Sequence, residues 1–266
     1  MSVLIVIPAR YASTRYPGKP LVALRGAGGV GKTLIRRSWD AAMAASGADR
    51  VVVATDDDRI SNEAKDFGAE VVMTSQDCEN GTERCADALN NIRQEFDIVV
   101  NLQGDAPLTP AWFVEDLIAA MEASPDADIA TPVLRCDAEA LRGFLEDRKA
   151  GRVGGTTAVF DRNHHALYFS KEVIPYTGGS FEEGDDIPVF HHVGVYAYRP
   201  DALRAYPSWP VGPLERNEGL EQLRFMENGR NVLCVEVDGR GCAFWELNNP
   251  EDVPRIETKL RELGID

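Results

Sequence analysis

Short runs of apolar residues alternate with amphipathic stretches along the first half of the chain. The apolar runs predict strands over residues 4–7, 51–54, 70–74 and 98–102. The stretches between them have the spacing of helices and cover residues 33–46, 59–67 and 82–92. This alternation indicates a mostly parallel sheet with helices on both faces.

The pattern becomes less regular after about residue 125. Residues 129–134, 157–160 and 189–198 are predicted strands with a more alternating character, while residues 214–228 and 250–263 are predicted helices. We therefore expect one Rossmann-like domain with a three-layer α/β/α arrangement and a smaller, β-rich second lobe. Open sheets of this kind bind ligands beyond the carboxyl ends of their strands.

Composition narrows the possible partners. The chain has 266 residues and a net charge of −15, so it is repelled by nucleic acids and by anionic membranes. An anionic substrate must then be held by a local cluster of Arg and Lys. The five cysteines are odd in number and include no CxxC pair, and the apolar run at residues 3–7 is too short for a signal sequence. These features predict a cytoplasmic protein.

Three cations lie in one loop directly after the first predicted strand. The loop, residues 8–20, contains Arg10, Arg15 and Lys19 together with prolines and a glycine that restrict it. The two arginines could each grip phosphate oxygens through two donors, and the lysine could stabilise a leaving pyrophosphate. The residue types alone are equally compatible with an ordinary solvated surface loop.

A carboxylate follows the predicted strand 98–102. Asp105 stands at the end of this strand, where it could hold Mg²⁺ against substrate phosphates. The alternative is a structural role, in which Asp105 caps the turn before Pro107.

The cationic loop also carries a family resemblance. The stretch IPARYASTRYPGKPL resembles the N-terminal signature of the 3-deoxy-manno-octulosonate (Kdo) cytidylyltransferases, and the strings VVVATDD, NGTER, NLQGDAP, HHVGVYAYR and LEQLR follow in that family's order. The resemblance implies a nucleotide-diphospho-sugar transferase fold, Mg²⁺ dependence and a homodimer. It also implies that CMP from CTP is joined to the anomeric hydroxyl of Kdo or a related 2-keto sugar acid, with release of pyrophosphate, for lipopolysaccharide or capsule synthesis.

The family's functional positions can be transferred residue by residue. The resemblance implies that residues 1–125 bind CTP and that residues 126–266 bind the sugar acid and form the dimer. It implies catalytic roles for Arg10, Arg15, Lys19 and Asp105. The implied nucleotide-binding residues are Ala9, Arg10, Ser13, Lys19, Thr74, Arg84 and Gln103. The implied sugar-binding residues are Gln103, His192, Tyr196, Glu221 and Gln222, and the implied metal ligands are Asp105 and Asn248.

The sequence departs from the family at functional positions. Asn248 stands where the family has a second metal-binding Asp, and an amide brings no charge. Either the metal site is weaker, or Glu246 takes over, or the protein is an inactive binding relative. Ala106, Thr157 and Lys171 also replace the usual Glu, Lys and Arg. These changes suggest a sugar acid other than plain Kdo.

Other polar clusters are given structural interpretations. Glu215, Glu218 and Glu221 are spaced to share one face of the predicted helix 214–228, a pattern more typical of a solvated surface. The pairs His164–His165 and His191–His192 do not predict a zinc site, because adjacent residues of a strand point to opposite faces.

A rival function rests on the glycine-rich segment 26–33. Its sequence matches GxxxxGK[ST], the phosphate-binding loop of ATPases and kinases, and a predicted helix follows it. The strand before it, residues 21–24, is short, whereas the strongest buried strand precedes the cationic loop instead. Compared with the Kdo family, residues 27–30 resemble a small insertion.

Overall fold

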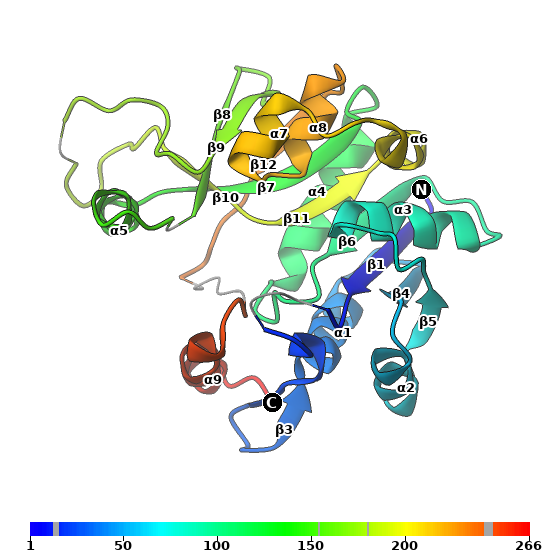
Figure 1. Cartoon of the computed structure of the whole chain (residues 1–266). Helices are drawn as coiled ribbons and strands as arrows, with labels where there is room; N and C mark the ends of the chain where they lie inside the picture. Colours follow the sequence, from blue (N-terminus) through cyan, green and yellow to red (C-terminus); the bar gives the residue numbers. More distant parts are fainter. Residues whose placement is uncertain (13–15, 154, 180, 242–246) are drawn as a thin grey trace.

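A ten-stranded mixed sheet forms the centre of the part of the chain that the structure describes (Figure 1). This computed structural model describes residues 1–12, 16–153, 155–179, 181–241 and 247–266. Its parallel part has the order β5 (Glu70–Met73), β4 (Arg50–Thr55), β1 (Val3–Ala9) and β6 (Ile98–Leu102). The chain moves from β1 to β4 on one side and later returns to β6 on the other. The carboxyl ends of β1 and β6 therefore form the switch point at which such sheets bind ligands.

The second half of the chain extends the same sheet. β11 pairs antiparallel with β6 and thereby joins the remaining strands to the parallel part. The second-half strands are β7 (Ile129–Arg135), β8 (Thr156–Phe160), β9 (Ala166–Ser170), β10 (Phe190–His192), β11 (Val195–Tyr198) and β12 (Val232–Glu236). The single strand predicted over residues 189–198 is wrong, because the chain leaves regular pairing at Val193 and Gly194. This break allows β10 to pair with β8 while β11 pairs with β6.

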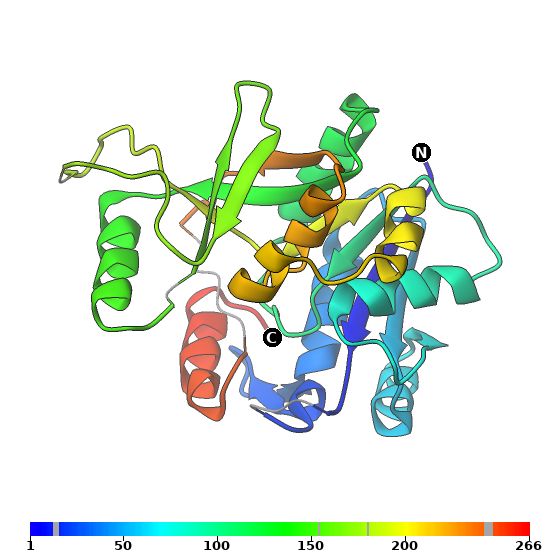
Figure 2. The same ribbon diagram turned by 45° about the horizontal axis from the view of Figure 1, so that its top comes forward.

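Helices cover both faces of the sheet (Figure 2). One apolar cluster joins the sheet to α3, α6 and α8, and another joins its opposite face to α1, α2 and α4. The expected three-layer α/β fold is confirmed. The helices are α1 (Leu34–Ala44), α2 (Asp58–Asp66), α3 (Gly81–Asn91), α4 (Ala111–Ala123), α5 (Ala138–Lys149), α6 (Pro200–Ala205), α7 (Pro213–Glu218), α8 (Gln222–Glu227) and α9 (Val253–Glu262).

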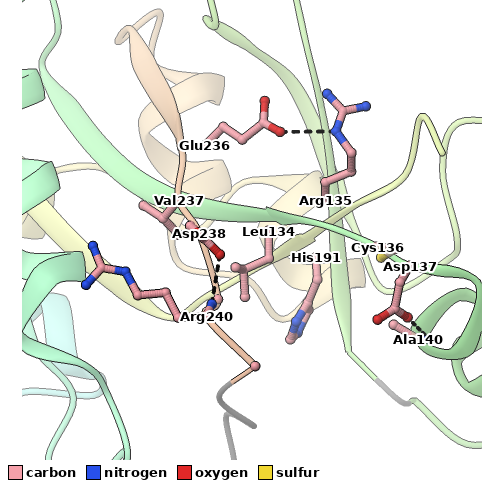
Figure 3. A pocket seen from close by; sticks show the side chains of 12 residues that line it. Leu134, Arg135, Cys136, Asp137, Ala140, His191, Glu236, Val237, Asp238 and Arg240 are labelled. Atoms are coloured by element: carbon pink, nitrogen blue, oxygen red, sulfur yellow. Dashed lines mark hydrogen bonds and ion pairs between the residues drawn. The ribbon is translucent and has the colours of Figure 1, made fainter. Parts of the chain in front are cut away.

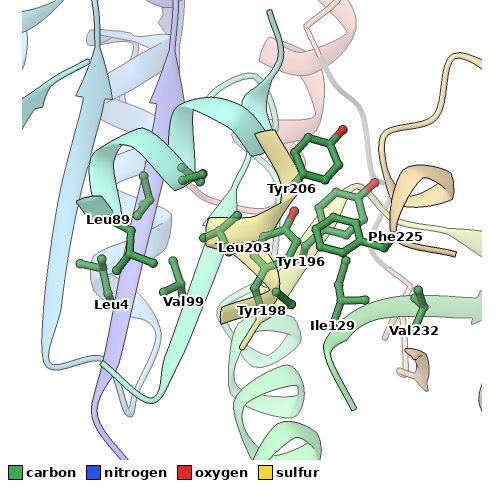
Figure 4. Close-up of a cluster of buried hydrophobic side chains, with 14 of the residues drawn as sticks. Leu4, Leu89, Val99, Ile129, Tyr196, Tyr198, Leu203, Tyr206, Phe225 and Val232 are labelled. Atoms are coloured by element: carbon green, nitrogen blue, oxygen red, sulfur yellow. The ribbon is translucent and has the colours of Figure 1, made fainter. Parts of the chain in front are cut away.

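A row of buried aromatic rings fixes α8 against the sheet (Figure 4). The rings of Tyr196 and Tyr198 on β11 lie 5.9 Å apart, and Tyr198 lies 5.5 Å from Phe225 on α8. Phe225 in turn stacks on Tyr206 at 4.9 Å. Large buried aromatic side chains contribute strongly to core stability. The row therefore holds α8 and β11 in a fixed relation.

The predicted helix 214–228 is wrong in its continuity. It is two short helices, α7 and α8, because Gly219 adopts a left-handed conformation with φ of 62° and ends α7. The interpretation of its carboxylates as a solvated stripe is also wrong. Glu215 is buried beside Arg224, and Glu218 accepts a hydrogen bond from Ser170 Oγ at 2.7 Å.

The glycine-rich segment 26–33 forms the tip and second strand of a hairpin. β2 (Ala23–Arg25) pairs antiparallel with β3 (Gly31–Thr33) in a separate small sheet. Lys32 Nζ donates to Asp40 Oδ2 at 3.0 Å and to the main-chain oxygen of Asp266 at 2.6 Å. A strand therefore lies between the glycines and the helix, and the lysine is held by the chain itself. This arrangement is not the strand–loop–helix of a phosphate-binding loop.

Within the described ranges, none of the helices has the length and hydrophobicity that a membrane span requires.

Candidate active site

The ends of β1 and β6 meet at very close range. A Cβ placed on Gly104 would lie only 2.6 Å from the carbonyl oxygen of Pro8, so only glycine allows this approach. The next residue, Asp105, then stands beside the loop that follows β1. Its Oδ2 lies 2.7 Å from Lys19 Nζ, in a partly buried ion pair. The structure thus brings together two of the residues predicted to be catalytic.

A main-chain hydrogen bond joins Tyr11 and Gly18 of the cationic loop. Gly18 N donates to the carbonyl oxygen of Tyr11 at 2.9 Å, and Gly18 has a φ of 72° that favours glycine. The guanidinium of Arg59 lies 3.3 Å from the centre of the Tyr11 ring. These contacts fix the approach to Lys19. The predicted residues Ser13 and Arg15 lie outside the described residues.

Arg10 reaches toward the turn that precedes α3. Its Nη1 donates to the carbonyl oxygen of Glu79 at 3.0 Å. Asn80 caps α3 by accepting a hydrogen bond from Glu83 N at 2.8 Å, and Gln103 lies so near that a Cβ on Gly81 would be 3.1 Å from its amide. Arg10 and Gln103 therefore both adjoin the N-terminus of α3.

Thr74 and Arg84 contact each other rather than open solvent. Arg84 is buried, and its Nη1 donates to Thr74 Oγ1 at 2.6 Å. The same nitrogen lies 3.2 Å from Asp56 Oδ1. The guanidinium is thus engaged within the protein and fixes the end of β5. Ala9, also predicted to bind the nucleotide, is the last residue of β1 and is buried.

Three residues predicted to bind the sugar, Tyr196, Gln222 and His192, lie beside one another. Tyr196 Oη donates to Gln222 Oε1 at 3.1 Å, and the Tyr196 ring lies 5.6 Å from that of His192. His192 Nε2 lies 2.9 Å from Thr131 Oγ1. Gln222 is buried, yet its Nε2 has no hydrogen-bond partner within the described residues. An unsatisfied buried donor is costly, and a ligand group can satisfy it.

Glu221, unlike Gln222, has its carboxylate hydrogen-bonded within the protein. Its Oε2 accepts hydrogen bonds from Thr82 N at 3.0 Å and from Thr82 Oγ1 at 2.6 Å. Burial raises the pKa of this carboxyl, while the bonds from Thr82 oppose the shift. Glu221 thus joins α8 to the first turn of α3. This turn follows β5, so the two predicted substrate halves meet here.

Asn248 adjoins Asp105 through the main chain. Leu247 N donates to the carbonyl oxygen of Asp105 at 2.9 Å, which brings the following residue to the end of β6. Asp105 and Asn248 carry side-chain oxygens of the kind that Mg²⁺ prefers. The described residues contain no group of three or more His, Cys, Asp or Glu arranged for a metal. Glu246 lies outside the described residues.

The rings of His191 and His192 on β10 face in opposite directions. His191 packs on Phe144 with ring centres 5.1 Å apart, whereas His192 packs on Phe169 at 5.1 Å. The prediction that the two rings point to opposite faces of the strand is confirmed. His191 lines a cavity of about 640 Å³ between β7, β12 and α5 (Figure 3). None of the predicted site residues lines this cavity.

Two of the positions that depart from the family have internal partners. Thr157 is buried, and its hydroxyl donates to the carbonyl oxygen of Glu172 at 2.7 Å. Lys171 N donates to Glu218 Oε2 at 2.9 Å.

Comparisons with known proteins agree with this topology and this group of residues. The sequence profile described as cytidylyltransferase matches residues 4–232. A 3-deoxy-manno-octulosonate cytidylyltransferase of Maricaulis maris is 44% identical over 97% of this chain and 96% of that protein. The mitochondrial 3-deoxy-manno-octulosonate cytidylyltransferase of Arabidopsis thaliana is 38% identical over 99% of this chain and 84% of that protein.

A solved structure gives the same result. CMP:2-keto-3-deoxy-manno-octonic acid synthetase complexed with CTP has a TM-score of 0.84 and 33% identity, covering 99% of this chain and 100% of that one. The chain therefore belongs to the cytidylyltransferase family, among the 3-deoxy-manno-octulosonate cytidylyltransferases.

Sequence reasoning missed several residues that shape the site. Gly104 allows β1 and β6 to approach, and it belongs to the string NLQGDAP that the chain shares with the family. Glu83 and Arg224 form a partly buried ion pair at 3.0 Å, and they belong to the strings NGTER and LEQLR. Their partnership gave no local signal, because the two residues are 141 positions apart.

Proposed function

We propose that this protein transfers CMP from CTP to the anomeric hydroxyl of Kdo or a related 2-keto sugar acid. The reaction releases pyrophosphate and activates the sugar for lipopolysaccharide or capsule synthesis. The observation that carries the proposal is the Lys19–Asp105 pair at the switch point of the sheet. A cation for phosphate and a carboxylate for a metal are adjacent there.

The triphosphate would lie between the cationic loop and α3. Arg10 and Lys19 would neutralise its charge, together with Arg15. Thr74, Arg84, Ala9, Ser13 and Gln103 would surround the rest of the nucleotide. A strongly acidic protein then holds its anionic substrate through local cations alone.

Mg²⁺ would be held by Asp105 and Asn248. When bound, the ion supplies positive charge to the phosphate oxygens as charge develops at the α-phosphorus. The Lys19 ammonium, already in contact with Asp105, adds a second cation at the same place. Lys19 would stabilise the departing pyrophosphate.

The sugar acid would lie beside Gln103, Tyr196, Gln222 and His192. Gln222 Nε2 is the available donor for its carboxylate or a hydroxyl. Burial lowers the pKa of His192 to about 3, so its ring is neutral at working pH. His192 would therefore act as a hydrogen-bonding group and not as a cation. The rate would arise from in-line positioning of hydroxyl and α-phosphate, without a covalent enzyme intermediate.

The substrate assignment is tested by initial rates of pyrophosphate release with Mg²⁺ and each of the four nucleoside triphosphates. Each is assayed alone, with Kdo, and with a panel of related sugar acids. Release only with CTP and one sugar acid is the expected result. Sugar-independent phosphate release from ATP would contradict the proposal and favour the Gly26–Thr33 segment. Binding of CTP without turnover on any sugar acid would favour an inactive relative.

Asn248→Asp is expected to lower the Mg²⁺ concentration for half-maximal rate by about tenfold, because a charged ligand replaces a neutral one. The measurement is a Mg²⁺ titration of the rate at saturating CTP and sugar acid. Asn249→Asp is the matched control, since it adds the same charge one residue away while keeping an oxygen to cap the turn before α9. Equal shifts in both variants, or none at Asn248, would exclude it as a metal ligand.

The assembly and location belong to the same proposal. We propose a cytoplasmic homodimer in which residues 1–125 bind CTP and residues 126–266 bind the sugar acid and form the dimer. The joining of both halves by one sheet supports a single domain.

A further inference from the structure

A buried arginine lies between carboxylates of two different helices. Arg224 on α8 is 3% exposed, and its Nε and Nη2 donate to Glu215 of α7 at 2.6 and 2.7 Å. Its Nη1 donates to Glu83 of α3 at 3.0 Å. The guanidinium also lies 4.1 Å from the centre of the Tyr206 ring. A planar, permanently charged group is suited to bridging two carboxylates in this way.

Glu83 also binds the turn that precedes α3, and so connects this turn to Arg224. Its Oε2 accepts a hydrogen bond from Glu79 N at 2.8 Å, and its Oε1 accepts one from Asn80 Nδ2 at 3.2 Å. Glu83 N donates in return to Asn80 Oδ1 at 2.8 Å. The position of the Glu83 carboxylate therefore determines the conformation of the Glu79–Asn80 turn.

The same turn also binds an arginine of the cationic loop. The carbonyl oxygen of Glu79 accepts the hydrogen bond from Arg10 Nη1 at 3.0 Å. A continuous series of hydrogen bonds thus runs from Arg224 through Glu83 and Glu79 to Arg10.

We infer that Arg224 is a positioning residue for the nucleotide, although it lies on the helix whose Gln222 faces the proposed sugar site. It holds Glu83, Glu83 holds the Glu79–Asn80 turn, and the turn orients Arg10 toward the triphosphate. The inference rests on the proposed function, because it assigns Arg10 to CTP. It adds a group that the family resemblance and the comparisons do not assign.

Charge balance explains why Arg224 has this effect. Without it, the carboxylates of Glu83 and Glu215 would face each other in a poorly solvated space with no cation between them. Glu83 would then turn toward water and release the Glu79–Asn80 turn.

The helices α3 and α8 are also held by contacts that do not involve Arg224. Glu221 binds Thr82 of α3, and Phe225 packs on Tyr198 and Tyr206. Loss of the Glu83 contact should therefore loosen the turn before it loosens α8.

The test compares Glu83→Gln, Arg224→Met, Arg224→Lys and the double variant Glu83→Gln/Arg224→Met with the wild type. CTP affinity is measured by titration calorimetry without sugar acid, and KM is measured for each substrate. Glu83→Gln is the variant most certain to fold, because Gln keeps the size of the side chain and removes only the charge that pairs with Arg224. Arg204→Met is the matched control, since Arg204 pairs with Glu95 at the surface, beyond the other end of α3.

We expect Glu83→Gln and Arg224→Met to weaken CTP binding by about tenfold, while the KM for the sugar acid changes less than about twofold. Arg224→Lys should recover part of the loss, because it restores charge without the planar fork. The double variant should be no weaker than Arg224→Met, because both changes interrupt one series of contacts. Arg204→Met should match the wild type.

Two results would overturn the inference while leaving the proposed function intact. One is unchanged CTP affinity in the Glu83 and Arg224 variants with only a lower melting temperature, which indicates a purely structural role. The other is a selective rise in the KM for the sugar acid. If instead the wild type neither binds CTP nor releases pyrophosphate, the proposed function fails and the inference fails with it.

Discussion

Asp105→Ala is expected to reduce turnover by on the order of 10³-fold, which corresponds to about 4 kcal/mol of transition-state stabilisation. The Asp105 carboxylate is the charged ligand of the proposed Mg²⁺ site, and it also holds Lys19 at 2.7 Å. Its removal would weaken Mg²⁺ binding and leave Lys19 without the carboxylate that positions it. The measurement is kcat from pyrophosphate release at saturating Mg²⁺ and CTP.

Lys32→Ala is the control for this variant. Lys32 forms a surface ion pair with Asp40, and such pairs contribute about 0–1 kcal/mol to stability. Its turnover should remain near that of the wild type. The opposite ranking, with Lys32→Ala inactive and Asp105→Ala active, would contradict the site and favour a phosphate-binding loop at the hairpin.

Gly104→Ala is expected to lower kcat/KM by about 10²-fold and the free energy of unfolding by about 1–3 kcal/mol. The new Cβ would lie 2.6 Å from the carbonyl oxygen of Pro8, so β1 and β6 would have to separate. This movement would displace Asp105 relative to the loop that carries Lys19. The measurements are steady-state kinetics and denaturant unfolding.

Gly143→Ala provides the comparison for Gly104. Gly143 lies within α5, and a Cβ there would meet no atom within 4 Å. Alanine at a helix interior should raise stability by about 0.5–1 kcal/mol and leave the kinetics unchanged. If Gly104→Ala behaved in the same way, the close contact at the strand ends would not control the site.

The pattern of apolar runs was sufficient to predict the parallel part of the sheet. The strands over residues 4–7, 51–54, 70–74 and 98–102 are all present, because buried parallel strands are continuously apolar. Ligands bind beyond the carboxyl ends of the strands in such sheets, so the cationic loop and Asp105 were expected to lie close together. The Lys19–Asp105 contact agrees with that expectation.

Contacts between separate helices and strands explain what the sequence did not predict. Glu215 has the spacing of a solvated helix face, but Arg224 reaches it only because Gly219 interrupts the helix. Likewise, residues 189–198 alternate as one strand, but their first part pairs with β8 and their last part pairs with β6. Local periodicity contains no information about either partner.

The most direct test of the central claim is the ³¹P NMR spectrum of the reaction of this protein with CTP, Mg²⁺ and Kdo or the preferred sugar acid. Transfer of CMP predicts one phosphodiester resonance for the CMP-sugar and an equal amount of pyrophosphate. Formation of CDP together with a sugar phosphate or inorganic phosphate, and no CMP-sugar, would show attack at the γ-phosphorus and contradict the account.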